Sequence, residues 1–222
     1  LMKVLVIAPH MDDEVLGCGG TISKHIESGD TLFVCFVARR IYNHQFDREK
    51  NEVEKKHANK AKEILGYEEA VFFELNDERL DACIQETLIP LEKYSLKIKP
   101  DIVYLPFRGD NHQDHRAVFD AARVALRPSA TPFIKRIYMY EVPSSTEQSP
   151  PLNECAFLPN YYVDITGHIE KKIEAFKSYE TEKRDYPHPR SDEALRVLAQ
   201  KRGIEIGFKY AETFMVLRDK WE

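Results

Sequence analysis

Short apolar runs alternate with longer charged segments along this sequence of 222 residues. The runs at 3–8, 31–38 and 101–106 are nearly continuous in Val, Leu and Ile, without the polar alternation of a half-exposed strand. Such runs are typical of strands that are buried on both faces of a parallel sheet. The segments between them have helical length and pattern. This alternation predicts an α/β fold, a doubly wound and mostly parallel sheet with helices on both faces.

The remaining elements follow from apolar spacing and from Gly, Pro and Asp at their ends. The further strands are expected at 70–74, 135–140, 161–164 and 208–216. Helices are expected at 13–28, 47–65, 81–97, 114–126 and 191–201, with one more between the strand at 161–164 and about residue 179. A loop is expected at 39–46. The Ser- and Pro-rich stretch 143–151 is interpreted as a second loop, because the segment beyond it is too small to fold alone. Residues 1–222 are therefore expected to form a single domain.

Composition argues against several classes of protein. The net charge of −5 is mild and the basic residues form no stripe, which disfavours a nucleic-acid partner. No apolar stretch has the length of a membrane span and no signal peptide opens the sequence, so we expect no transmembrane segment. The four cysteines are scattered, without the paired spacing of a zinc knot or a redox site. A reduced, cytoplasmic protein is the simplest interpretation of these features.

Two polar clusters begin where buried strands are predicted to end. HMDDE at 10–14 follows the first strand, and NHQDH at 111–115 follows the strand at 101–106. In open α/β sheets ligands bind at this edge. A hydrolytic zinc site has three ligands of His and carboxylate type and one open position for water. The predicted ligands are His10 and Asp13, three apart at a strand-to-helix turn, and His115 from the second cluster.

The residues between these ligands suit a hydrolase. Asp12 is the candidate general base for a metal-bound water. His112 is the candidate hydrogen-bond donor to the oxyanion, and Asp114 the candidate partner that orients His112 or His115. Taken one at a time, the acids also suit a helix N-terminus and the histidines a surface loop. The occurrence of both clusters after buried strands favours the metal site.

These clusters resemble the motifs of the LmbE/PIG-L zinc de-N-acetylases. PHMDDE at 9–14 is similar to the family's (P/A)HPDDE motif, and HQDH at 112–115 to its HPDH-like motif. Met11 and Gln113 stand at spacer positions where the family usually has Pro. Further stretches match in the family's order: GGTI at 19–22, ILG at 64–66, and YAETF at 210–214, which is similar to the AEAF stretch.

The resemblance implies a Rossmann-like, LmbE-like sheet and a zinc-dependent deacetylase that hydrolyses the N-acetyl group of an amino sugar such as N-acetylglucosamine. It implies Zn2+ at His10, Asp13 and His115, with Asp12 as the base and His112 as the electrophilic helper. The implied partner is a small amino-sugar substrate or conjugate. Trimers and hexamers occur in the family, which leaves a homo-oligomer open. The segment 38–46 has no family counterpart and is expected to border the substrate.

Candidate substrate contacts carry weaker signals. Arg40, Arg48 and Arg190 suit an anionic or hydroxyl-rich substrate, with a solvated or helix-paired charge as the alternative for each. Arg190 ranks first because the resemblance places its His-Pro-Arg stretch near the substrate. Glu14 is expected either to support a ligand or a substrate hydroxyl, or to cap the helix.

Two groups of residues are expected to be structural. The glycines at 17, 19 and 20 lack the spacing of a phosphate-binding turn and favour close helix–strand packing. Several histidines lack a second ligand at metal spacing and are expected to be structural or exposed: His25, His44, His57, His168 and His188.

The sequence leaves two other functions open. One is a zinc hydrolase for a different amide or for a nucleotide-linked sugar. The other is a non-catalytic Rossmann-like protein that binds a sugar or a nucleotide, against which the complete set of ligands and base argues.

Overall fold

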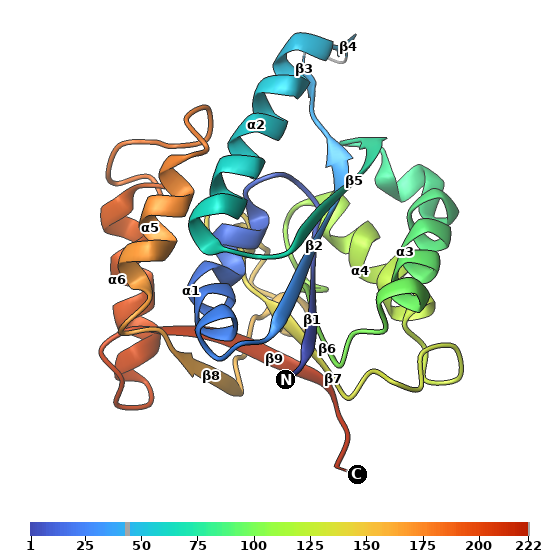
Figure 1. Cartoon of the computed structure of the whole chain (residues 1–222). Coiled ribbons are helices and arrows are strands. Elements are labelled where there is room, and N and C mark those ends of the chain that lie inside the picture. The colour runs from blue at the N-terminus through green and yellow to red at the C-terminus, as the bar shows by residue number, and fades with distance from the viewer. Residues whose placement is uncertain (43–44, 222) are drawn as a thin grey trace.

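A computed structural model describes residues 1–42 and 45–221, so the expectation for His44 lies outside the described residues. Within these ranges a seven-stranded sheet forms the centre of the molecule (Figure 1). Its strands, in order across the sheet, are β5 (Glu69–Asn76), β2 (Thr31–Arg39), β1 (Lys3–Ala8), β6 (Ile102–Pro106), β7 (Arg136–Tyr140), β9 (Ala211–Asp219) and β8 (Tyr161–Asp164). β9 runs antiparallel to both of its neighbours, β7 and β8, and the other neighbouring strands of the sheet are parallel. The predicted α/β fold with a mostly parallel sheet is confirmed.

Helices cover both faces of the sheet, as Figure 1 shows. One face carries α1 (Asp13–Glu27), α2 (Arg48–Leu65), α5 (Ile169–Lys177) and α6 (Asp192–Ile204); the other carries α3 (Ile84–Ile98) and α4 (Gln113–Ala125). In β1, Val4 and Val6 belong to one apolar core and Leu5 and Ile7 to the other. This is why residues 4–8 are apolar throughout. Among the described residues, no helix is both long and apolar enough to cross a bilayer.

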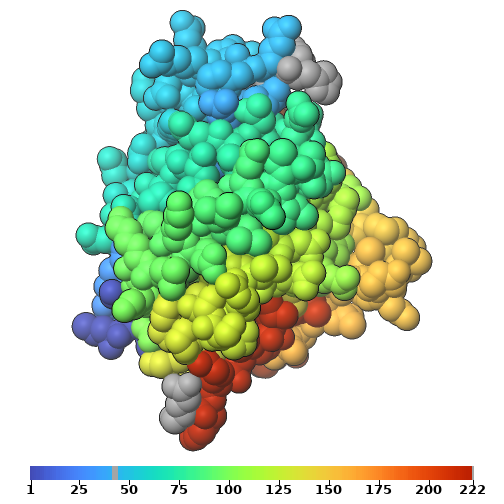
Figure 2. Space-filling view, turned by 90° about the vertical axis from the view of Figure 1, so that its right-hand side faces the viewer, coloured from blue at the N-terminus to red at the C-terminus, as the bar shows by residue number. Residues whose placement is uncertain are grey.

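Three expected elements differ from the structure. The expected loop at 39–46 contains two short strands, β3 (Ile41–Tyr42) and β4 (Gln45–Phe46), which pair with each other in antiparallel fashion. The helix expected from 81 is preceded by a 3-10 turn, Leu80–Cys83, whose Leu80 is buried in the sheet's second core, and α3 begins at Ile84. The last strand, expected from about 208, begins at Ala211, after a turn at 205–207 and a bend at 209–210. Figure 2 shows the residues from 45 to about 50, in light blue, at the opposite end of the molecule from the red C-terminal residues.

The strand order places the two polar clusters side by side. From β1 the chain moves outward through β2 to β5 and then returns to β6 on the other side of β1. Val6 of β1 is paired with Tyr104 of β6. The carboxyl ends of β1 and β6 therefore flank the point where the order reverses, which is the usual ligand-binding crevice of such sheets.

The stretch that resembles AEAF anchors α1 to the sheet. Glu212 of β9 is buried and accepts hydrogen bonds from the backbone N–H groups of Gly20 (2.9 Å) and Thr21 (2.7 Å). Lys172 Nζ lies 2.6 Å from Glu212 Oε1 and donates to the carbonyl of Leu16 at 2.8 Å. A buried ion pair is stabilised when its remaining groups are hydrogen-bonded in this way. The pair thus fixes the helix whose first residues reach the polar clusters.

Close packing explains the glycines of α1, as predicted. A Cβ at Gly17 would lie 2.3 Å from the ring of Tyr140, and one at Gly20 would lie 2.7 Å from Ile165. The Tyr140 ring is fully buried and its hydroxyl donates a hydrogen bond to the carbonyl of Ile7 at 2.7 Å. Displacing the ring would therefore cost free energy.

We expect Gly17→Ala to lower the free energy of unfolding by about 1–3 kcal/mol, the usual cost of overpacking a core. Urea denaturation of the purified variant measures this loss. Gly167→Ala is the matched control, because no atom lies within 4 Å of a Cβ at that position. Equal stability of the two variants would contradict the packing argument.

Candidate metal centre and catalytic cavity

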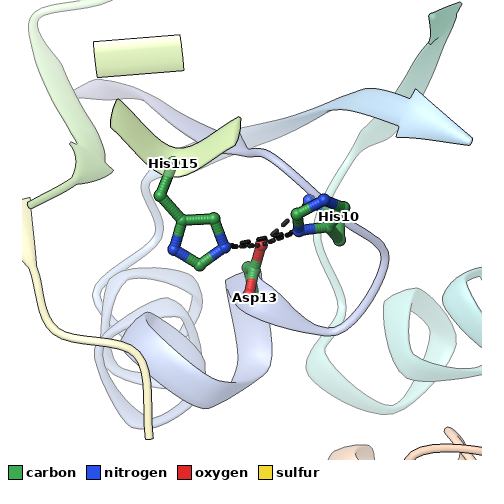
Figure 3. A group of neighbouring side chains, drawn as sticks. All are labelled: His10, Asp13 and His115. Carbon is green, nitrogen blue, oxygen red and sulfur yellow. Dashed lines mark hydrogen bonds and ion pairs between the residues drawn. The ribbon is translucent and has the colours of Figure 1, made fainter. Parts of the chain in front are cut away.

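Three side chains meet where β1 and β6 end. His10 lies in the turn after β1, Asp13 is the first residue of α1, and His115 lies in the first turn of α4. Figure 3 shows the carboxylate of Asp13 pointing at the ring nitrogens of both histidines. Asp13 Oδ2 is 3.2 Å from His10 Nδ1 and 3.3 Å from His115 Nε2, and these two nitrogens are 3.3 Å apart.

These distances fit a tetrahedral metal ion. Ligands at about 2.0–2.1 Å from a tetrahedral zinc stand about 3.3 Å from one another. Burial lowers the pKa of His10, but hydrogen bonds to Asp114 and Asp13 outweigh it and raise the pKa to about 9. The pKa of His115 rises to about 10, because the charges of Asp13 and Asp110 outweigh burial. The carboxylates that hold these protons can equally compensate a dication that replaces them.

Asp114 orients His10. Its Oδ2 lies 3.2 Å from His10 Nε2 and accepts a hydrogen bond from the backbone N–H of Glu78 at 2.6 Å. The sequence interpretation assigned Asp114 to His112 or His115, so this part of the prediction needs correction. The reason is that Asp114, in the first turn of α4, faces across the crevice towards the turn after β1.

Asp110 takes the role that was expected of Asp114. Its Oδ1 lies 3.1 Å from His115 Nδ1, and its Oδ2 accepts a hydrogen bond from Thr146 Oγ1 at 2.5 Å. It also accepts from Ser145 Oγ and from the backbone N–H of His112. The sequence analysis missed this residue. Its place just before the second cluster was the available signal, but its hydroxyl partners, Ser145 and Thr146, come from the loop after β7.

Asp12 is held in an unusual conformation with its carboxylate directed into the site. Its φ angle is 131°, a region that favours glycine, and its side chain makes no capping hydrogen bond to α1. Burial raises its pKa to about 7, although the charge of Arg190, 3.1 Å from Oδ2, opposes the rise. A carboxyl with a pKa near neutrality is suited to act as a general base.

Glu14 holds the backbone of Asp12 in place. One oxygen accepts a hydrogen bond from the Tyr179 hydroxyl, and the other accepts from the backbone N–H of Asp12 at 3.2 Å. Glu14 is fully buried and does not line the cavity beside the metal ligands. Its placement is that of a supporting residue, and it does not agree with the expected substrate contact.

His112 is set up as a hydrogen-bond donor. Its Nδ1 accepts a hydrogen bond from the backbone N–H of Asp114 at 3.2 Å, so it also caps α4. Burial and the nearby rings of His10 and His115 lower its pKa to about 4. The ring is therefore neutral at pH 7, and because Nδ1 is an acceptor the proton resides on Nε2.

A cavity of about 330 Å³ opens onto these groups. Its lining includes Asp12, His112 and the two metal-site histidines, together with Arg40 and Arg190. Arg48, by contrast, is exposed at the start of α2 and does not reach the cavity. Both cavity arginines contact the buried carboxylate of Glu182, a residue that the sequence analysis did not single out.

The other described histidines lie elsewhere. His25 contacts Asp30 and Tyr104, and His168 lies 3.0 Å from Ser23 Oγ. None of the described histidines outside the two clusters belongs to a group of three possible metal ligands. Two more histidines were expected to be structural or exposed. His57 lies in α2, and His188 accepts a hydrogen bond from a backbone N–H.

Comparison with known proteins places the chain in a family. Residues 5–126 match the PIG-L model, described as GlcNAc-PI de-N-acetylase. The chain belongs to the PIG-L family. Among the relatives of this PIG-L protein is the diacetylchitobiose deacetylase of Thermococcus kodakarensis. The two are 27% identical in an alignment 223 residues long, which covers 95% of this chain and 81% of the relative.

Solved structures with the same fold include proteins of different activity. The conserved protein TT1542 from Thermus thermophilus has a TM-score of 0.80 and 23% identity, over 100% of this chain and 97% of that one. GalB, the 4-carboxy-2-hydroxymuconate hydratase from Pseudomonas putida, has a TM-score of 0.77 and 22% identity, over 100% and 98%. These similarities concern the fold, and the reaction of this PIG-L protein has to be argued from its site.

Proposed function

We propose that residues 1–222 act as a single-domain, zinc-dependent deacetylase. The reaction is hydrolysis of the N-acetyl group of an amino sugar or its conjugate, with release of the free amine and acetate. One observation carries the proposal: Asp13, His10 and His115 lie 3.2–3.3 Å apart, and the two histidines line the same cavity as Asp12 and His112. The diacetylchitobiose deacetylase among the relatives supports the choice of substrate class.

The site residues have separate roles in hydrolysis of the amide. His10, Asp13 and His115 would hold the metal, which when bound supplies a Lewis acid for the amide carbonyl and lowers the pKa of water. Asp12 takes the proton of the attacking water as the new C–O bond forms. His112 donates its Nε2–H to the carbonyl oxygen as negative charge develops there.

Collapse of the tetrahedral oxyanion completes the reaction. The C–N bond breaks, and its electron pair goes to nitrogen. The proton that Asp12 took from water passes to this nitrogen, so the amine leaves neutral and Asp12 is again a carboxylate. Asp110 and Asp114 keep the rings of His115 and His10 in position throughout, through contacts of 3.1 Å and 3.2 Å.

We expect removal of the metal to abolish hydrolysis. Protein dialysed against a chelator should lose amine release from N-acetylglucosamine and N,N′-diacetylchitobiose by at least about 100-fold, since metal activation of water supplies much of the rate. Stoichiometric zinc should restore it, and protein dialysed against buffer alone is the control. Unchanged hydrolysis after the metal is gone would overturn the zinc assignment. Binding of a sugar or a dinucleotide without hydrolysis by the metal-loaded protein would favour the non-catalytic alternative.

A further inference from the structure

A buried carboxylate joins the two arginines of the cavity wall. Glu182 follows α5 and is 2% exposed. It forms ion pairs with Arg40, which follows β2, and with Arg190, which lies before α6. Burial alone would raise the pKa of Glu182, but the hydrogen bond and charge of Arg40 and the charge of Arg190 lower it. Glu182 is therefore ionised at neutral pH.

The charges of both arginines are compensated inside the protein. Arg190 contacts Asp12 at 3.1 Å in addition to Glu182, and its Nε donates to Ser144 Oγ at 2.7 Å. Among the described residues that line the cavity, Arg40 and Arg190 are the permanently cationic ones. Asp77 and Glu78 add further carboxylates to the same lining.

This balance of charge discriminates between classes of substrate. A diphosphate group needs uncompensated Arg or Lys side chains, with which it forms charge-assisted hydrogen bonds. In this cavity it would have to compete with Glu182 for both guanidinium groups. Sugar hydroxyls need only donors and acceptors, and a guanidinium group has five N–H donors, of which the ion pairs occupy a part.

We propose that Glu182 is the specificity-determining residue that makes this cavity take a neutral saccharide and reject a nucleotide-diphosphate-linked sugar. It does so by pairing with both Arg40 and Arg190, whose charges it offsets together with Asp12, while both arginines remain hydrogen-bond donors to hydroxyl groups. The proposal rests on the proposed function for the reaction itself, and it adds the chemical class of the group that is attached to the acylated sugar.

The first test uses the unaltered, zinc-loaded protein. We expect kcat/KM for N,N′-diacetylchitobiose to exceed that for uridine-diphosphate-linked N-acetylglucosamine by at least about tenfold, the factor that corresponds to one hydrogen bond to a charged group. The difference should lie in KM. Equal or better use of the nucleotide-linked sugar would overturn the proposal.

The second test removes the compensating charge. Glu182→Gln should bind uridine diphosphate at least about tenfold more tightly than the unaltered protein does, measured by calorimetric titration, because the arginines then lack their carboxylate. Glu180→Gln, an exposed glutamate on the same turn, should not change the affinity. Adding Arg40→Met to Glu182→Gln should remove the gain. A gain that persists in the double variant, or no gain in a folded Glu182→Gln, would overturn the proposal.

The two proposals fail in distinguishable ways. If no N-acetylated sugar is hydrolysed, the proposed function is wrong, yet the titration with uridine diphosphate still tests Glu182. If Glu182→Gln does not fold, as judged by its thermal unfolding, titration of the unaltered protein with uridine diphosphate and with N,N′-diacetylchitobiose decides. Tighter binding of the neutral disaccharide supports the proposal, and tighter binding of the diphosphate contradicts it.

Discussion

Asp12→Asn is expected to keep its metal and to lose turnover by roughly 10²–10⁴-fold, the contribution of a positioned general base. The amide that replaces the carboxylate has nearly the same shape but cannot accept the proton of water. The metal should stay, because Asp12 is not among the three groups that lie 3.2–3.3 Å from one another. Steady-state rates of amine release, measured beside the zinc content of the same preparation, test this.

Asp81→Asn serves as the matched control, since Asp81 is an exposed aspartate outside the cavity. Its kcat should equal that of the unaltered protein. Near-normal turnover by Asp12→Asn would assign the base to another residue. Loss of zinc from Asp12→Asn would move Asp12 into the set of ligands and also contradict the division of roles.

His115→Ala should lose the metal and, with it, hydrolysis. The unaltered protein is expected to hold about one zinc per chain, as sites with three protein ligands do. Loss of a supporting partner alone weakens metal binding by about 10–100-fold, so loss of a ligand should weaken it by more than about 100-fold. Elemental analysis after removal of excess zinc provides the measurement. Zinc should also raise the thermal unfolding temperature of the unaltered protein but not that of the variant.

The control for this variant is His57→Gln, because His57 lies in α2 and outside the groups of possible metal ligands. It should retain full zinc content. If His115→Ala kept one zinc per chain with unchanged affinity, the ion would be bound elsewhere. In that case the other described cluster, His10 with His112 and Asp114, would become the candidate.

Local features of the chain account for what the sequence alone predicted. Residues 4–8 of the first strand are apolar throughout because alternate residues enter two different cores, so the burial of this strand can be predicted from the sequence alone. His10 and Asp13 are three residues apart at a strand-to-helix turn, and a backbone hydrogen bond from Asp13 to His10 holds that turn at 3.4 Å. Both the apolar run and this spacing are local properties of the chain. The α/β fold was predicted from apolar runs of that kind, and the choice of His10 and Asp13 from their spacing.

Only the tertiary structure decided how the supporting residues are shared. The carboxylate of Asp114 contacts His10, and Asp110 contacts His115. Glu14 accepts a hydrogen bond from Tyr179, and Glu182 joins Arg40 to Arg190. Several of these contacts join residues that are far apart in the sequence, such as Asp114 with His10 and Glu14 with Tyr179, whereas Asp110 and His115 lie in the same segment after β6. Which loops meet depends on strand order and crossover, here on β6 returning beside β1. Hydrophobic periodicity records which face of an element is buried, but it carries no information about the partner on the other side of that face.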